Sequence, residues 1–209
     1  MLGGGQLVNA QLPTEAALAQ TYGVSRQVVR EAARLLEDRG LVNIRPGRGM
    51  TVAAPSLETI VQRYRSVLRR DKASFAHLME LRQMIEVDMT ALAARNRTDT
   101  DVDHMREVLA EASAHVDDYE ACLDADLRFH LAVASATQNP FVVTFVEPIN
   151  TVLRDLYRKP IGYLATQKGT LREHGAIAEA IAAGDPAAAR AAAAAHLERI
   201  VKDAAKLLG

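Results

Sequence analysis

Residues 22–52, YGVSRQVVREAARLLEDRGLVNIRPGRGMTV, decide the fold of the first part of the chain. Gly23 ends one short helix, and the hydroxyl of Ser25 can accept a hydrogen bond from the free N–H groups that begin the next. Arg26 and Arg30 then lie one turn apart on one face of that second helix. The stretch therefore predicts a helix-turn-helix whose second helix presents arginines to the major groove of DNA.

The other face of the second helix carries apolar residues, which we expect to turn into a core: Val28, Val29, Ala32, Leu35 and Leu36. After Gly40, residues 41–45 and 50–53 alternate as two strands around the turn Pro46–Gly49. This pattern predicts a β-hairpin wing with Arg48 at its tip. The residues expected to contact DNA are Ser25, Arg26, Gln27, Arg30, Arg45, Arg48 and Gly49.

Length and composition indicate two modest domains rich in helix. The chain has 209 residues, of which 49% are hydrophobic and only 4% aromatic, and alanine is abundant. The net charge of −1 divides into +2 for residues 1–54 and −3 for the remainder. A weakly basic segment before an acidic one favours local contact with DNA over general polyanion binding.

The setting expected from the sequence is cytoplasmic. No run of residues approaches the roughly twenty apolar positions that a membrane span needs, and no signal peptide is visible. The single cysteine cannot form an internal disulfide. We therefore expect no membrane partner.

Ala54–Ser56 is the expected hinge, which divides the chain into a winged helix-turn-helix domain (1–54) and a second domain (55–209). Beyond the hinge the apolar spacing is helical throughout. The expected helices span 57–70, 74–96, 101–114, 119–136, 141–157, 171–183 and 186–208, with a bend at Pro148. The fold class is therefore mainly α, with a small hairpin wing followed by an all-α bundle of about seven helices.

Four residues of the second domain have the spacing of a metal site. Asp126 and His130 are four residues apart on one helix, so their side chains project side by side. His174 precedes Asp185 by eleven residues and His196 follows it by eleven, so an antiparallel helix pair brings both histidines to the same height. One carboxylate and three imidazoles suit a borderline divalent cation such as Zn²⁺, Ni²⁺ or Mn²⁺. The alternative is that each side chain is an ordinary hydrogen-bonded one.

Arg82 is a candidate for binding a carboxylate. It falls within the apolar stripe of helix 74–96, and a buried arginine needs an acceptor. The acceptor is either the carboxylate of a small-molecule effector or a carboxylate of the bundle such as Glu86, and the sequence leaves both open. Asn139, Arg154 and Tyr157 are further candidates to line an effector pocket.

The first domain resembles the GntR family of bacterial transcription regulators. The resemblance rests on L-P-T-E (12–15), V-S-R-x-x-V-R-E (24–31) and G-L-V-x-x-R-x-G-x-G (40–49). It implies that Arg26 and Arg30 contact bases or phosphates and that the wing reaches the minor groove. The family usually has a helix ahead of L-P-T-E, whereas MLGGGQLVNAQ precedes it here. Absence of that helix would expose Leu35 and Leu36.

The second domain is similar to the FCD domain, the effector-binding helical domain of the FadR branch of GntR regulators. The similarity rests on D-L-R-F-H (126–130), E-H-x-x-I (173–177), A-I-A-A-G-D (180–185) and A-A-x-x-H-L (192–197), with E-L-R (80–82). It implies a metal bound by Asp126, His130, His174 and His196. It also implies a small carboxylate effector that completes the metal's coordination, with Arg82 facing it.

The leading hypothesis is a ligand-responsive, homodimeric repressor that binds a palindromic double-stranded operator. Two other classes stay open. One is a helical metal-dependent enzyme, although no H-E-x-x-H, activated nucleophile or phosphate-binding loop is present, so we expect no enzyme activity. The other is a regulator for which the metal ion itself is the signal.

Overall fold

The computed structural model describes residues 8–53, 57–70, 75–156 and 163–208. The chain divides into two compact units, Met1–Gln62 and Arg63–Gly209, and each is described by itself. We call the described residues 8–53 the headpiece and the unit from Arg63 onward the body.

The headpiece contains the expected helix-turn-helix. Helix α1 (Glu15–Tyr22) ends at Gly23, whose φ of 65° is the left-handed conformation that glycine adopts without strain. Helix α2 (Arg26–Asp38) starts at Ser25, whose hydroxyl accepts from the backbone N–H of Val28 at 3.3 Å. The predicted turn and cap are both confirmed.

The wing follows α2 as two antiparallel strands, β1 (Val42–Arg45) and β2 (Gly49–Val52), with Arg45 paired to Gly49 across the turn. A feature that the sequence did not reveal is the course of residues 9–12. Their backbone lies along β2, with N–H to O distances of 2.9 Å from Asn9 to Val52 and 2.8 Å from Leu12 to Met50. The wing therefore has a third, short segment hydrogen-bonded to its second strand.

The expected buried face of α2 is wrong for most of its members. Val29 and Ala33 are buried, but Val28, Leu35 and Leu36 are 50%, 59% and 39% exposed, and Ala32 is also exposed. Within the described residues no helix precedes α1 to cover this side of α2, because residues 9–12 lie along the wing instead. This is the exposure of Leu35 and Leu36 expected if the preceding helix is absent.

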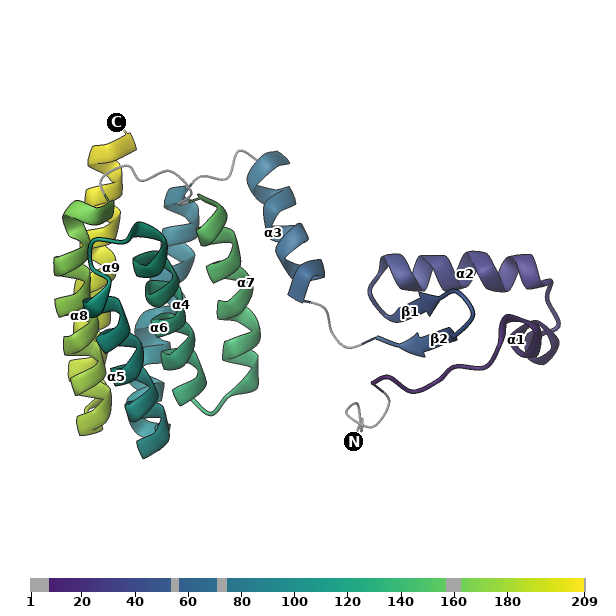
Figure 1. Cartoon of the computed structure of the whole chain (residues 1–209), viewed down its shortest axis with the longest axis horizontal. Coiled ribbons are helices and arrows are strands. Elements are labelled where there is room, and N and C mark those ends of the chain that lie inside the picture. The colour runs from purple at the N-terminus through teal and green to yellow at the C-terminus, as the bar shows by residue number, and fades with distance from the viewer. Residues whose placement is uncertain (1–7, 54–56, 71–74, 157–162, 209) are drawn as a thin grey trace. The chain divides into compact units, whose positions relative to one another are not determined.

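Seven helices follow in the described part of the chain: α3 (Leu57–Arg70), α4 (Phe75–Asn96), α5 (Asp99–Ala114), α6 (Tyr119–Ala136), α7 (Pro140–Leu156), α8 (Tyr163–Ala183) and α9 (Pro186–Leu208). Helix α4 packs against α9, α6 and α8, while α5 packs against α6 and α8, and α7 against α6 (Figure 1). Helix α7 continues through Pro148. The body is thus the predicted all-α bundle.

Helices α8 and α9 form the hairpin on which the site depends. Gly184, with a φ of 68°, ends α8, and Asp185 caps α9 by accepting from the N–H groups of Ala187 and Ala188 at 2.9 and 3.0 Å. Pro186 then takes the first position of α9, where it costs no hydrogen bond. Helix α8 begins at Tyr163, eight residues before the predicted start.

The core of the body has two clusters of buried apolar side chains. The larger joins helices α4 to α9 around Met105, Phe129 and Ile181. The smaller joins α4, α6 and α7 around Met79, Leu123 and Leu153. No helix in the described ranges is both long and apolar enough to span a membrane.

Candidate metal centre and DNA-contacting residues

Three histidines from three helices meet in the interior of the body. His130 comes from α6, His174 from α8 and His196 from α9, and each is 2–3% exposed. One ring nitrogen of each lies within 4.8 Å of those of the others. The hairpin brings Nε2 of His174 and Nε2 of His196 to 3.3 Å. Two nitrogens bound at 2.0–2.1 Å to one tetrahedral zinc would be roughly 3.3 Å apart, so this spacing fits a shared ion.

Asp126 lies beside the cluster, with its Oδ1 3.7 Å from Nε2 of His174 and its side chain 11% exposed. Its position one turn before His130 on α6 follows from the helical spacing. The structure therefore brings all four predicted ligands together, the three histidines more closely than the aspartate.

The electrostatics of the cluster favour the neutral form of His174 and of His196. Burial lowers the pKa of His174 well below its ordinary value, and the neighbouring charges of His196 and His130 lower it further. Burial also lowers the pKa of His196, although its hydrogen bond to Glu173 opposes this. Neutral rings carry a lone pair, which is the form that binds a metal.

Two glutamates that the metal-site prediction did not include contact the outer edges of the cluster. Nδ1 of His130 lies 2.8 Å from Oε2 of Glu86, and Nδ1 of His196 lies 2.7 Å from Oε2 of Glu173. Burial would raise the pKa of Glu86, but Arg82 and His130 outweigh it and hold that pKa far below its ordinary value. The pKa of Glu173 falls to about 2, because its hydrogen bonds to His196 and Arg199 outweigh burial. Both carboxylates are therefore ionised acceptors.

Arg82 is one of the buried charged residues of the body, and its acceptor in this structure is Glu86. Nε of Arg82 donates to Oε1 at 2.5 Å, and Nη2 donates to Oε2 at 3.2 Å. This is the bundle ion pair that the sequence left open as one of two alternatives. A role for Arg82 toward an effector stays a prediction.

Asn139 and Arg154, two other predicted effector residues, do not join the histidines. Asn139 caps α7, with Oδ1 accepting from the N–H of Phe141 at 3.0 Å. Arg154 donates to Oδ1 of Asp124 at 2.7 Å and borders a surface depression between α6 and α7. Tyr157 lies outside the described residues. Their contribution to an effector pocket stays a prediction.

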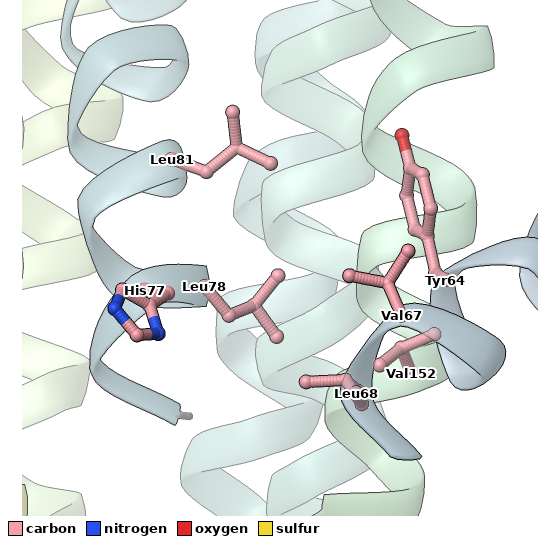
Figure 2. A pocket seen from close by; sticks show the side chains of 7 residues that line it. All are labelled: Tyr64, Val67, Leu68, His77, Leu78, Leu81 and Val152. Carbon is pink, nitrogen blue, oxygen red and sulfur yellow. The ribbon is translucent and has the colours of Figure 1, made fainter. Parts of the chain in front are cut away.

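A separate cavity of about 220 Å³ lies between α3, α4 and α7 (Figure 2). None of its lining residues belongs to the histidine cluster: Tyr64, Val67, Leu68, His77, Leu78, Leu81 and Val152. Its walls are almost wholly apolar, and it is smaller than the usual ligand pocket of 300–1,000 Å³. It is therefore poorly suited to a charged effector.

In the headpiece, the predicted DNA-contacting side chains are exposed, as contact with DNA requires. Arg26 and Gln27 open α2, and Arg45 and Arg48 flank the turn of the wing. Gly49 has a φ of 81°, and a Cβ there would lie 2.8 Å from Nε2 of Gln11. The wing turn thus depends on glycine for both conformation and space.

Arg30 has a partner that the sequence did not reveal. Its Nη2 donates to Oε2 of Glu15 in α1 at 2.8 Å, and its Nε lies 3.2 Å from both carboxylate oxygens. A bidentate pair fixes the plane of the guanidinium. Glu15 is part of the L-P-T-E motif, so a motif residue of the first helix holds an arginine of the second.

Comparisons with known proteins agree with this geometry. Residues 3–52 match the bacterial regulatory proteins of the gntR family, and residues 77–199 match the FCD domain. The chain is 33% identical over 195 residues to the transcriptional regulator LutR of Bacillus subtilis, covering 91% of this chain and 89% of that protein. It is 30% identical to the galactonate operon transcriptional repressor of Escherichia coli, covering 91% and 85%. It is 31% identical to the repressor NanR of Citrobacter rodentium, covering 91% and 75%.

A solved structure, GntR of Streptococcus agalactiae, shares the fold with a TM-score of 0.74 at 24% identity, covering 94% of this chain and 90% of that one. The family consists of transcription regulators, so the expectation of a regulator rather than an enzyme is confirmed. The chain belongs to the GntR family of bacterial transcription regulators and, through its FCD domain, is a ligand-responsive DNA-binding regulator.

Proposed function

We propose that the body binds one divalent ion through His130, His174 and His196, with Asp126 as a fourth ligand, and that a small carboxylic acid completes its coordination. The observation that carries this is the convergence of three buried imidazoles. Within the described part of the chain, Nε2 of His130 is buried without a hydrogen-bond partner. A buried polar atom left unsatisfied is costly, and a metal ion would remove that cost.

A bound divalent ion, rather than the protein charges alone, would favour an anionic effector. Arg82 and Arg199 lower the pKa of His174 through their positive charge, so their field reaches the centre of the site. Four carboxylates, those of Glu86, Glu173, Asp126 and the Arg199 partner Asp203, carry two more charges than these two arginines. A divalent ion would bring this balance to about zero, and four protein ligands leave coordination positions on the ion open for ligand oxygens. One relative is named for a galactonate operon, and galactonate is a hydroxylated carboxylate.

The headpiece supplies the DNA contacts in this proposal, through Arg26 and Arg30 on α2 and the wing around Arg48. We propose further that the regulator is a homodimer of the FadR branch, that each headpiece reads half of a palindromic operator, and that it represses. Two of the relatives compared above are named as repressors. The acid would shift the population of headpiece arrangements and weaken operator binding.

The test is a titration of operator binding by the full chain, with DNA selected from a random pool by the protein itself. Metal-stripped protein, zinc-loaded protein and zinc-loaded protein with hydroxy or sugar acids are compared. The proposal expects acid to weaken DNA binding only when zinc is present. His174→Ala should abolish the response to acid, whereas the exposed His104→Ala should retain it.

Other outcomes identify the alternatives. If zinc alone changes DNA binding and no acid adds to it, the ion is the signal. If an acid acts equally well on stripped protein and on His174→Ala, recognition of the effector does not pass through the metal, and the proposal is wrong.

A further inference from the structure

We infer that Glu86 and Glu173 are positioning residues, each held by an arginine, that orient His130 and His196 so that both Nε2 atoms face the centre of the histidine cluster. The inference rests on the proposed metal site. It adds two sets of hydrogen-bonded side chains, each an arginine, a glutamate and a histidine, which we call relays. The two relays come from different helices and have the same order of contacts. In each relay, the arginine donates hydrogen bonds to both carboxylate oxygens, and the carboxylate accepts a hydrogen bond from Nδ1 of the histidine.

The first relay is built on α4 and α6 and is wholly buried. Arg82 and Glu86 are one turn apart on α4, and their side chains are 3% and 5% exposed. The guanidinium contacts both carboxylate oxygens, at 2.5 and 3.2 Å. Oε2 of Glu86 then lies 2.8 Å from Nδ1 of His130. The carboxylate is thus fixed on one side by Arg82 and on the other by the ring it orients.

The second relay joins α8 and α9. Nε and Nη2 of Arg199 donate to the two oxygens of Glu173 at 2.5 and 2.8 Å. The same guanidinium is anchored by Asp203 at 3.0 Å and by the hydroxyl of Thr170 at 2.8 Å. Oε2 of Glu173 lies 2.7 Å from Nδ1 of His196. Because two further acceptors hold Arg199 in place, Arg199 in turn fixes the position of the Glu173 carboxylate.

The relays fix the tautomer of each ring. An ionised carboxylate only accepts hydrogen bonds, so each contacted ring must donate from Nδ1. A neutral ring that carries its proton on Nδ1 has its lone pair on Nε2. The Nε2 atom of His196 faces that of His174 at 3.3 Å, and that of His130 is buried without a partner among the described residues. The lone pairs are therefore available where a cation would sit.

His174 is oriented by packing as well. Its ring stacks on Phe129, with centroids 4.3 Å apart and planes inclined by 17°. Carboxylates that accept from metal-binding histidines make the rings more basic and fix their direction, and loss of one typically weakens metal binding ten- to a hundredfold. The relays thus predict an effect on metal affinity from residues that do not contact the ion.

The experiment compares Glu173→Gln with Glu179→Gln in the full chain. Both residues lie on α8 and pair with an arginine, but Glu179 pairs with Arg106 at 3.4 Å and is largely exposed. Zinc affinity is measured by competition with a chelator, and the fold is followed by circular dichroism. Glu173→Gln should lose about ten- to a hundredfold in zinc affinity while remaining folded. Glu179→Gln should bind zinc like the wild type.

The buried relay needs a variant that leaves no unpaired charge. Arg82→Met combined with Glu86→Leu removes both partners at similar volume, so the body should stay folded while zinc affinity falls by a similar factor. Equal zinc affinity in the wild type, Glu173→Gln and the double variant would overturn the inference.

The tautomers are read independently of metal by ¹⁵N NMR of the histidine rings in stripped protein. The inference expects His130 and His196 to carry the proton on Nδ1. An Nε2–H tautomer of either ring in the wild type would overturn the inference for that relay. Wild type that binds no zinc would instead refute the proposed metal site, and the tautomers would still decide whether the relays orient the rings.

Discussion

Removing one partner of the buried pair between Arg82 and Glu86 should be among the most destabilising single changes in the body. The side chains are 3% and 5% exposed, so Glu86→Ala leaves a guanidinium that water cannot reach. Breaking a buried ion pair in this way costs about 3–5 kcal/mol. For a chain of this length each kcal/mol lowers the melting temperature by roughly 2–4 °C, so a fall of roughly 6–20 °C is expected.

The assay is unfolding of the full chain by urea, for the free energy, and by heat, for the melting temperature, in the presence of a chelator and followed by the helical circular dichroism signal. The control is Asp88→Ala, since Asp88 pairs with Arg190 at the surface and both side chains are at least half exposed. Loss of such a pair costs about 0–1 kcal/mol. The double variant Arg82→Met, Glu86→Leu should recover most of the lost stability. If Glu86→Ala costs no more than Asp88→Ala, the reasoning about this pair is wrong.

Three further predictions concern the headpiece and the cluster. Arg26→Ala or Arg30→Ala should weaken operator binding roughly tenfold to a hundredfold, as measured by fluorescence anisotropy. If the lost contact was to a base, specificity should relax at one base pair. If it was to a phosphate, the dependence of binding on salt concentration should become weaker. Hydrogen exchange should show the headpiece opening at lower free energy than α8 and α9, because most of the apolar residues on α2 are exposed. Equal protection of the two regions would contradict this. Acidification should release the metal. Burial lowers the pKa values of His174 and His196, so protons compete with the metal for these rings only below the ordinary value of about 6.5. Metal content that does not fall with pH, down to the pH at which the body unfolds, would refute histidine ligation.

Much of the fold could be predicted because local signals agree with the tertiary structure. Gly23 ends α1 and Ser25 caps α2 in the helix-turn-helix. In the same way, Gly184 ends α8 and Asp185 caps α9 in the α8–α9 hairpin. Once that hairpin is fixed, equal sequence distances from the loop bring His174 and His196 together. The pairing of His174 with His196 therefore followed from spacing alone.

The start of α8 could not be predicted, because Gly169 inside the helix opposes helix formation by about 1 kcal/mol. Burial of Gln167 and Thr170 accompanies the longer helix in the structure. The buried face of α2 was wrong for a related reason. Apolar spacing shows which face could be buried, but it does not show whether another element covers it.

The relays were hidden because they depend on contacts between helices. Glu173 precedes His174 in sequence, yet it contacts His196 and Arg199 on the next helix. From sequence alone, a charged residue that pairs with another helix cannot be told from an exposed one, because the packing of the two helices is not known. Only Glu86 had a local signal, since it lies one turn after Arg82.

The most direct test of the central claim is the metal content of the full chain, determined by elemental analysis after reconstitution with zinc and removal of loosely bound ions. The account predicts one divalent ion per chain in the wild type and in the surface control His104→Ala. It predicts that His174→Ala and His196→Ala, folded as judged by circular dichroism, retain little or none. Wild type without a stoichiometric ion, or unchanged metal content in both cluster variants, would contradict the claim that these buried histidines form a metal centre.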